Sequence, residues 1–402
     1  MTMTKKNVNK RINKIKIKKQ SNTIIMDIIK HYGNLFQNDI KNKKLFSLLY
    51  NSIEIASKEA NKITHEEQIT SISQIDLKPS YFLDKSIVNN LIKKIDNLYT
   101  CNFLIKECNF TVKIYFNYND RFKINNMIKF IKILLCFCLQ YYENQKQVLN
   151  YSINLYLGDD KKGFSSGFTN MIESKNINSG FYYHDPTVNV SNIVIFRKEE
   201  WFKTLIHECV HCFNLDFQAS KICFKSLFSD TFFLETIMMV NEAITEFWAR
   251  TINVAIVTYF GLENKNLKNF SELYTINLNI ERMFSIYQSY KILKLFGLRY
   301  ENIINKDRET INKKIYHEKT NAFCYYVLTS LLMFEYNKTM DWFTDNKYES
   351  NIFKKTEREF MIFCYFLKQV AKKEELLSIF NQVESNDIRY KSLKMCAFEL
   401  DI

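Results

Sequence analysis

Residues 207 to 211 read His207-Glu208-Cys209-Val210-His211, a stretch with the pattern HExxH. In an α-helix, two histidines four positions apart lie on the same face, one turn from each other. The glutamate next to the first histidine then lies close to both imidazoles. This stretch predicts a helix that presents two metal ligands with an acidic side chain beside them, and the expected fold is built around that helix.

The residue types in this stretch fit the chemistry of a catalytic zinc ion. Such an ion takes three protein ligands from imidazole nitrogens or carboxylate oxygens and keeps its fourth position for water. The ion lowers the pKa of that water to about 7, and a neighbouring base accepts the proton. We therefore expect Zn²⁺ as the cofactor, His207 and His211 as two of its ligands, and Glu208 as the catalytic base.

The third ligand is expected from a second helix. Residues 230 to 257 contain neither glycine nor proline and read as one long helix, which Ser229 or Asp230 can cap. Large apolar side chains surround an acidic stripe on this helix, so we expect most of the helix to be buried. A buried carboxylate needs a partner, and zinc would be the partner of Glu242; the alternative is a solvent-exposed acidic face. The stripe consists of Glu235, Met239, Glu242 and Glu246.

Two other acids remain alternatives to Glu242 as the third ligand. Glu246 lies one helical turn further along the same predicted stripe. Asp216 lies five residues after the second histidine, and it could ligate if the first helix stops at Asn214 and the chain turns back. Asparagine suits such a stop because it tolerates the left-handed backbone conformation.

The two motifs together resemble the gluzincin metallopeptidases, the thermolysin-like group. The resemblance implies that Glu242, which follows Asn241, is the third ligand, and that Glu246 holds His207. It covers about forty of the 402 residues, the spacer is longer than in thermolysin, and Glu246 stands where the group usually has aspartate. The surroundings also resemble uncharacterised zincin-like proteins of large DNA viruses. The implied activity is zinc-dependent hydrolysis of peptide bonds in a peptide or protein substrate.

A donor for the oxyanion of the reaction is still missing from these motifs. Residues 316 to 326 contain the only histidine after the HExxH stretch and a pair of adjacent tyrosines. From this stretch we take His317 and Tyr326 as candidates. The alternative for each of them is an ordinary surface or packing role.

The chain is expected to be an α+β protein that is predominantly helical, with a small sheet and a zincin-like catalytic core. Residues 188–196 read as a strand because β-branched residues recur in them, and residues 153–157 read as another because apolar and polar side chains alternate there. Residues 178–181 and 158–167 read as turns. In a zincin a strand edge lies beside the metal, where a peptide can extend it. The expected parts are a basic disordered tail (1–23), a helical segment (24–145), the catalytic segment (146–260) and a helical C-terminal domain (261–402).

Three further stretches are predicted to be helical from their apolar periodicity. Residues 127–142 read as a core helix that is too short and too charged to span a bilayer, so we expect no transmembrane segment. Residues 355–373 and 392–400 are expected to be helices that pack their apolar faces on the core.

Charge and cysteine usage suggest a partner and a compartment. Eight of the first twenty residues are Lys or Arg, and this basic tail predicts a weak contact with nucleic acid. The ten cysteines follow no disulfide framework and are expected to be reduced, which favours a cytoplasmic location, in a host cytoplasm or a virion. Besides the peptidase, two functions remain open: a zincin-fold interaction module without activity, and a nucleic-acid-binding protein.

Overall fold

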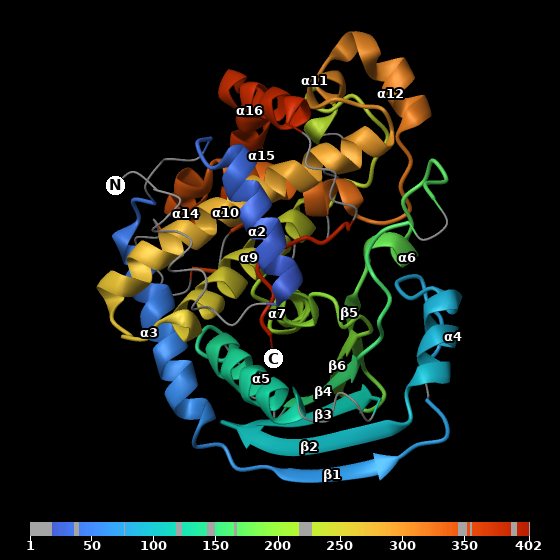
Figure 1. Cartoon of the computed structure of the whole chain (residues 1–402), viewed down its shortest axis with the longest axis vertical. Helices are drawn as coiled ribbons and strands as arrows, with labels where there is room; N and C mark the ends of the chain where they lie inside the picture. The colour runs from blue at the N-terminus through green and yellow to red at the C-terminus, as the bar shows by residue number, and fades with distance from the viewer. Residues whose placement is uncertain are drawn as a thin grey trace. The chain divides into compact units, whose positions relative to one another are not determined.

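The computed structural model describes residues 18–35, 40–75, 77–117, 123–142, 149–164, 167–216, 227–344, 352–353, 356–386 and 392–401. In these residues the chain is an α+β protein, mostly helical, with one mixed six-stranded sheet (Figure 1). The expected fold class is confirmed at this level. The chain divides into two compact units, a sheet unit (51–162 and 174–215) and a helical unit (1–50, 163–173 and 216–401).

The sheet has the strand order β1-β2-β3-β4-β6-β5 (Figure 1). Strands β3, β4 and β6 run parallel to one another, while the β1–β2, β2–β3 and β5–β6 pairs are antiparallel. The strands predicted at 153–157 and 188–196 correspond to β4 and β6. The bounds are β1 (Glu66–Ser71), β2 (Asn97–Ile105), β3 (Cys108–Phe116), β4 (Leu149–Tyr156), β5 (Gly180–Asp185) and β6 (Val190–Ile195).

Two predictions about the sheet unit were wrong. The segment 24–145, expected to be helical, contains β1, β2 and β3, and buried residues alternate along β3 as a period of two requires. Residues 178–181, expected to form a turn, include the start of β5. A Cβ atom at Gly180 would lie 2.7 Å from the side chain of Ile195 and 2.9 Å from that of Thr204. This glycine therefore permits close packing and does not mark a turn.

Helices cover both faces of the sheet. Val88 and Leu91 of α4 (Lys85–Lys94) form one core cluster with Val194 and Phe196, which lie on one face. Helix α7 (Trp201–Cys212) packs against β5, β6 and α5 (Ile124–Cys138). The predicted core helix over 127–142 is confirmed as α5, which is buried along most of its length. The sheet unit also contains α6 (Ser174–Ile177), and α3 (Lys43–Ala60) is divided between the two units.

The helical unit is built around two long helices, α9 (Val240–Gly261) and α10 (Leu267–Leu295), which pack together. Almost every side chain of α9 from Val240 to Tyr259 is buried. The helix predicted at 355–373 is confirmed as α15. The remaining elements are α2 (Lys19–Tyr32), α11 (Tyr300–Ile303), the 3₁₀ helix η2 (Lys306–Arg308), α12 (Glu309–Ile315), the π-helix η3 (Phe323–Leu328), α13 (Thr329–Phe334), α14 (Tyr336–Thr344), α15 (Glu357–Ala371) and α16 (Glu374–Ser385).

The long helix predicted over 230–257 begins ten residues later than expected, at Val240. The preceding stretch is irregular because its main-chain N–H groups bond to distant partners. Phe233 donates to the carbonyl of Ile303 (2.7 Å), and Ile237 donates to the side chain of Glu318 (3.2 Å). Glu235 and Met239 therefore lie outside the helix that carries Glu242, and the acidic stripe of four residues does not exist.

Residues 392–400, predicted to be helical, are irregular although most of their side chains are buried. Their main-chain groups form hydrogen bonds with side chains of α9 and α10, and not with each other as they would in a helix. The N–H of Ala397 donates to Glu281 (2.8 Å), and the carbonyl of Phe398 accepts from Asn253 (2.9 Å). The apolar pattern thus correctly indicated burial but not the type of structure.

Residues 19–23, which were predicted to belong to the disordered tail (1–23), form the start of α2. Residues 1–17 lie outside the described residues, and so does Cys223. The other nine cysteines are free thiols, and all of them are buried, as expected. In the described parts of the chain no helix has the length and apolar character needed to cross a membrane.

Candidate metal centre

The two histidines of the HExxH stretch lie on α7 in the sheet unit, one turn apart as predicted. Their Nε2 atoms are 3.2 Å apart, and the two rings stand at 73° to each other. Two ligands of a tetrahedral zinc ion, each 2.0–2.1 Å from the metal, lie about 3.3 Å apart. The separation of the Nε2 atoms of His207 and His211 therefore fits two ligands of one Zn²⁺ ion.

Glu208 is buried next to these histidines, with 6% of its surface exposed. Helix α7 is buried almost all the way round, and the side chains of Leu205, Ile206 and Cys209 have no exposed surface at all. In surroundings of low polarity a charge interacts more strongly with its neighbours than it does in water. This environment suits a carboxylate that has to accept a proton close to a metal ion.

Helix α7 ends at Cys212, just before Asn214, as the alternative with Asp216 as a ligand requires. Asn214 adopts the left-handed conformation with φ of 51°, and the N–H of Leu215 donates to the carbonyl of Val210 (2.8 Å). This arrangement satisfies carbonyl groups that the last helical turn leaves without partners. Asp216 follows directly and is half-buried.

The N-terminus of α7 is held by a buried ion pair that the sequence interpretation missed. Glu200 precedes the helix in the left-handed conformation with φ of 57°, and its carboxylate lies 3.0 Å from the ammonium of Lys162. Both side chains are buried, and the neighbouring Glu199 accepts from the main-chain N–H of Lys162 (2.7 Å). The loop after β4 thus fixes the start of the helix that carries the two histidines.

Glu242 belongs to the helical unit and lies in the first turn of α9, where the helix dipole favours a negative charge. One of its carboxylate oxygens accepts a hydrogen bond from the hydroxyl of Tyr325 (3.1 Å). Tyr325 lies in the π-helix η3, a rare form that is frequent at functional sites. The sequence pointed to this tyrosine pair but not to Tyr325.

The two candidate oxyanion donors differ in exposure: Tyr326 is buried and His317 is exposed. Tyr326 is fully buried and its hydroxyl donates to the main-chain carbonyl of Leu393. This position argues against Tyr326 as the oxyanion donor, because a hydroxyl packed inside the helical unit cannot reach a substrate. His317 is exposed, with its Nε2 atom 3.0 Å from the carbonyl oxygen of Lys314, and its catalytic role stays a prediction.

Glu246 has a buried partner of its own in the helical unit. Its carboxylate lies 3.0 Å from Arg250, one turn further along α9, and both side chains are inaccessible to solvent. The same guanidinium donates to the hydroxyl of Ser285 (2.7 Å) and to the carbonyl of Tyr325 (3.2 Å). Opposite charges at this helical spacing are a recognisable signal, so Arg250 could have been found from the sequence. The predicted bond from Glu246 to His207 stays a prediction.

Replacing Arg250 by Met is expected to lower the free energy of unfolding by about 3–5 kcal/mol, because the buried carboxylate of Glu246 would lose the guanidinium that pairs with it. Arg299→Met is the control. Arg299 pairs with Glu301 and Glu384 at the surface, where such a pair contributes at most about 1 kcal/mol. Guanidinium chloride titrations of both variants measure the difference. Equal losses in the two variants would contradict the assignment of Arg250 as an essential counter-ion.

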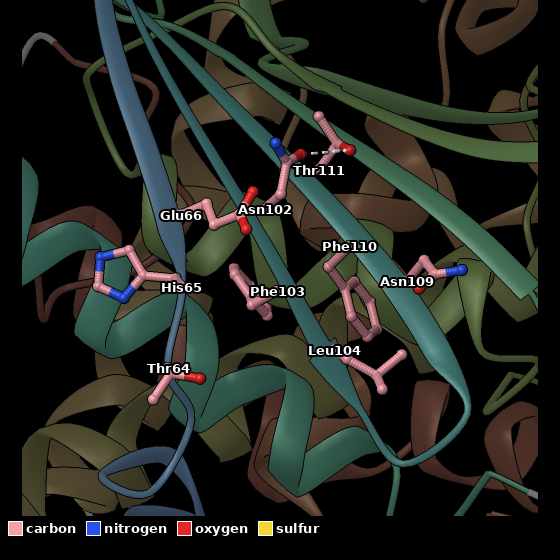
Figure 2. Close-up of a pocket in the computed structure, with 9 residues that line it drawn as sticks. All are labelled: Thr64, His65, Glu66, Asn102, Phe103, Leu104, Asn109, Phe110 and Thr111. Atoms are coloured by element: carbon pink, nitrogen blue, oxygen red, sulfur yellow. Dashed lines mark hydrogen bonds between the residues drawn. The ribbon is translucent and has the colours of Figure 1, made fainter.

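A separate hollow of about 560 Å³ lies in the sheet unit at the ends of β2 and β3 (Figure 2). It is lined by Thr64, His65, Glu66, Asn102, Phe103, Leu104, Asn109, Phe110 and Thr111. The two ring nitrogens of His65 contact Lys132 (2.9 Å) and Glu67 (3.4 Å). These contacts occupy both ring nitrogens of His65, and none of the predicted site residues lines the hollow.

Comparisons with known proteins reveal no relative: no family model, no curated protein and no solved structure matches the chain. The function therefore has to be inferred from the chemistry of the residues themselves.

Proposed function

We propose that the chain is a zinc-dependent peptidase of the gluzincin type. His207, His211 and Glu242 would hold one Zn²⁺ ion, and Glu208 would activate the attacking water. The observation that carries the proposal is the 3.2 Å separation of the two Nε2 atoms on a helix that reads HExxH. It is supported by the half-buried carboxylate of Glu242, which lies in the first turn of α9 and is held by the hydroxyl of Tyr325.

The proposed residues divide the reaction between them. When bound, the zinc ion would polarise the substrate carbonyl and lower the pKa of the attacking water. Glu208 would accept the proton of that water and pass it to the leaving amine, which requires a carboxylate that does not itself bind the metal. The hydroxyl of Tyr325 holds one carboxylate oxygen of Glu242, which would direct the other oxygen to the ion.

A peptide is the proposed substrate because the sheet unit has a strand that can bind one. β5 is an edge strand of the sheet, and in the described residues it pairs only with β6. Its first residue, Gly180, packs against Thr204, which precedes His207 by three residues on α7. An extended peptide can bind to such an edge through main-chain hydrogen bonds, close to the helix that carries the histidines.

The purified full-length chain is expected to contain one zinc ion per molecule and to cleave members of a mixed peptide library. Elemental analysis after dialysis measures the metal, and mass spectrometry of the library measures cleavage with and without a chelator. The control is His31→Ala, which removes an exposed histidine of α2 and should retain zinc and activity. A chain that takes up no zinc would refute the proposal. Stoichiometric zinc without any cleavage would favour the inactive zincin-fold interaction module.

A further inference from the structure

The carboxylate of Glu318 gathers four hydrogen-bond donors inside the helical unit. One oxygen accepts from the hydroxyl of Thr236 and from the N–H of Ile237 (3.2 Å). The other accepts from the hydroxyl of Tyr316 (2.9 Å) and from the N–H of Phe323 (2.8 Å). Two of these donors belong to the stretch before α9, and one is the first residue of the π-helix η3. Glu318 thus ties two separate parts of the chain together.

The stretch before α9 and the π-helix η3 are also joined through Cys324. The thiol of Cys324 donates to the carbonyl of Ile237 (3.2 Å), and its sulfur lies 3.2 Å from the main-chain nitrogen of Met239. One residue later, the hydroxyl of Tyr325 reaches Glu242. A continuous series of contacts, through Cys324 and Tyr325, therefore connects Glu318 to Glu242.

The start of α9 lacks the usual means of fixing a helix end. Met239 occupies the N-cap position, and no side chain there accepts a hydrogen bond from the first turn. The stretch before it is irregular, so the contacts with Glu318 and Cys324 determine where the helix begins. Because Glu242 lies in the first turn, those contacts also determine where its carboxylate lies.

We propose that Glu318 is a positioning residue that fixes Glu242 in the geometry needed to bind a metal ion. This inference rests on the proposed function. Glu318 does not itself bind the ion; it acts through the stretch 236–239 and through η3, which carries Tyr325. A carboxylate that is already held in place loses little conformational freedom on binding a metal, so the affinity for the metal is higher.

The charge of Glu318 is sensitive to pH in the neutral range. Burial raises the pKa of Glu318 to about 7, although its four hydrogen bonds act in the opposite direction. Tyr316 and Cys324 face it, and burial raises the pKa of both groups well above their usual values, so they stay protonated. Below pH 7 the protonated carboxyl becomes a donor itself and can no longer accept all four bonds. The hold on Glu242 therefore weakens as the pH falls.

The test compares zinc binding by full-length Glu318→Ala and Glu318→Gln with that of the unchanged chain. Competition with a chromophoric chelator at pH 8 is expected to show affinity about 10- to 100-fold lower for Glu318→Ala. Glu318→Gln should lose less, since its amide oxygen still accepts. Its deficit relative to the unchanged chain should shrink at pH 6, where Glu318 is protonated. Histidine protonation affects both proteins alike and cancels in this ratio.

A second measurement does not depend on the metal. In the zinc-free protein, hydrogen exchange at the amides of Ile237 and Met239 should be faster in Glu318→Ala. The matched control is Glu335→Gln, which alters a glutamate of the same unit that pairs with Lys373 and Lys338. This control should bind zinc as the unchanged chain does and keep the two amides protected.

The outcomes separate this inference from the proposed function. If the unchanged chain binds no zinc, the proposed function fails, whatever the exchange of Ile237 and Met239 shows. If the unchanged chain binds zinc and Glu318→Ala binds it equally tightly, the positioning role is refuted. Should Glu318→Ala not fold, Glu318→Gln decides, because an affinity of Glu318→Gln equal to that of the unchanged chain at both pH 8 and pH 6 also refutes the positioning role.

Discussion

Glu208→Gln is expected to bind one zinc ion per molecule and to hydrolyse peptides about 10²- to 10⁴-fold more slowly than the unchanged chain. The amide has the size of the carboxylate but cannot accept a proton from water. Because Glu208 is not among the three proposed ligands, its replacement should leave zinc affinity close to that of the unchanged chain. Measurements of kcat on a cleaved library peptide and of bound zinc in the same sample test both halves of the expectation.

Glu66→Gln provides the control for this experiment. Glu66 is exposed on β1 and should tolerate the same chemical change without effect on kcat or zinc content. Two results would contradict the role of Glu208 as the base. A kcat close to that of the unchanged chain would mean that another group accepts the proton, and loss of zinc from Glu208→Gln would show that the carboxylate has a structural role.

The parts of the fold that could be predicted are those that local sequence determines. The spacing of His207 and His211 indicated α7, and Asn214, which the sequence offered as one possible stop, adopts the left-handed backbone just after the end of that helix. The β-branched run of β6 indicated a strand. In each of these cases the residues that specify the structure lie within a few positions of it.

The parts that could not be predicted depend on distant partners. Residues 236–239 have helical composition, but their N–H groups bond to Glu318 and Cys324, more than 80 positions away. Residues 392–400 likewise bond to α9 and α10. An apolar pattern indicates that a stretch is buried, but it does not reveal which groups satisfy its backbone. The strands β1 to β3 are a different case, because the alternation along β3 was present in the sequence and was overlooked.

The candidate site shows the same division. HExxH is local and was found, whereas the choice between Tyr325 and Tyr326 depends on the π-helix η3. A π-helix has more residues per turn than an α-helix, so it changes which of two neighbouring side chains faces a given partner. Only Tyr325 reaches Glu242, while Tyr326 packs inside the unit. Arg250, by contrast, was predictable from its spacing to Glu246.

The third ligand can be identified by removing each acid in turn. Glu242→Ala is expected to lose zinc affinity by more than the roughly 10- to 100-fold that removal of an outer residue costs, and to lose hydrolysis with it. Glu246 needs a paired change, because Glu246→Gln alone would leave Arg250 buried and charged without its partner. The double variant Glu246→Gln with Arg250→Gln removes both charges and should keep zinc. Chelator competition on Glu242→Ala, on the double variant and on the unchanged chain gives the comparison.

The results discriminate among the three acids because each makes a different prediction. If Glu242→Ala retains zinc while the folded double variant loses it, Glu246 is the ligand and Glu242 only lies near the metal. If both retain zinc, Asp216→Ala should remove it, since Asp216 follows the turn at Asn214 that ends the histidine helix. If Glu242→Ala, the double variant and Asp216→Ala all retain zinc, the ion binds without any of these carboxylates. The gluzincin arrangement would then be excluded, whatever the activity of the chain.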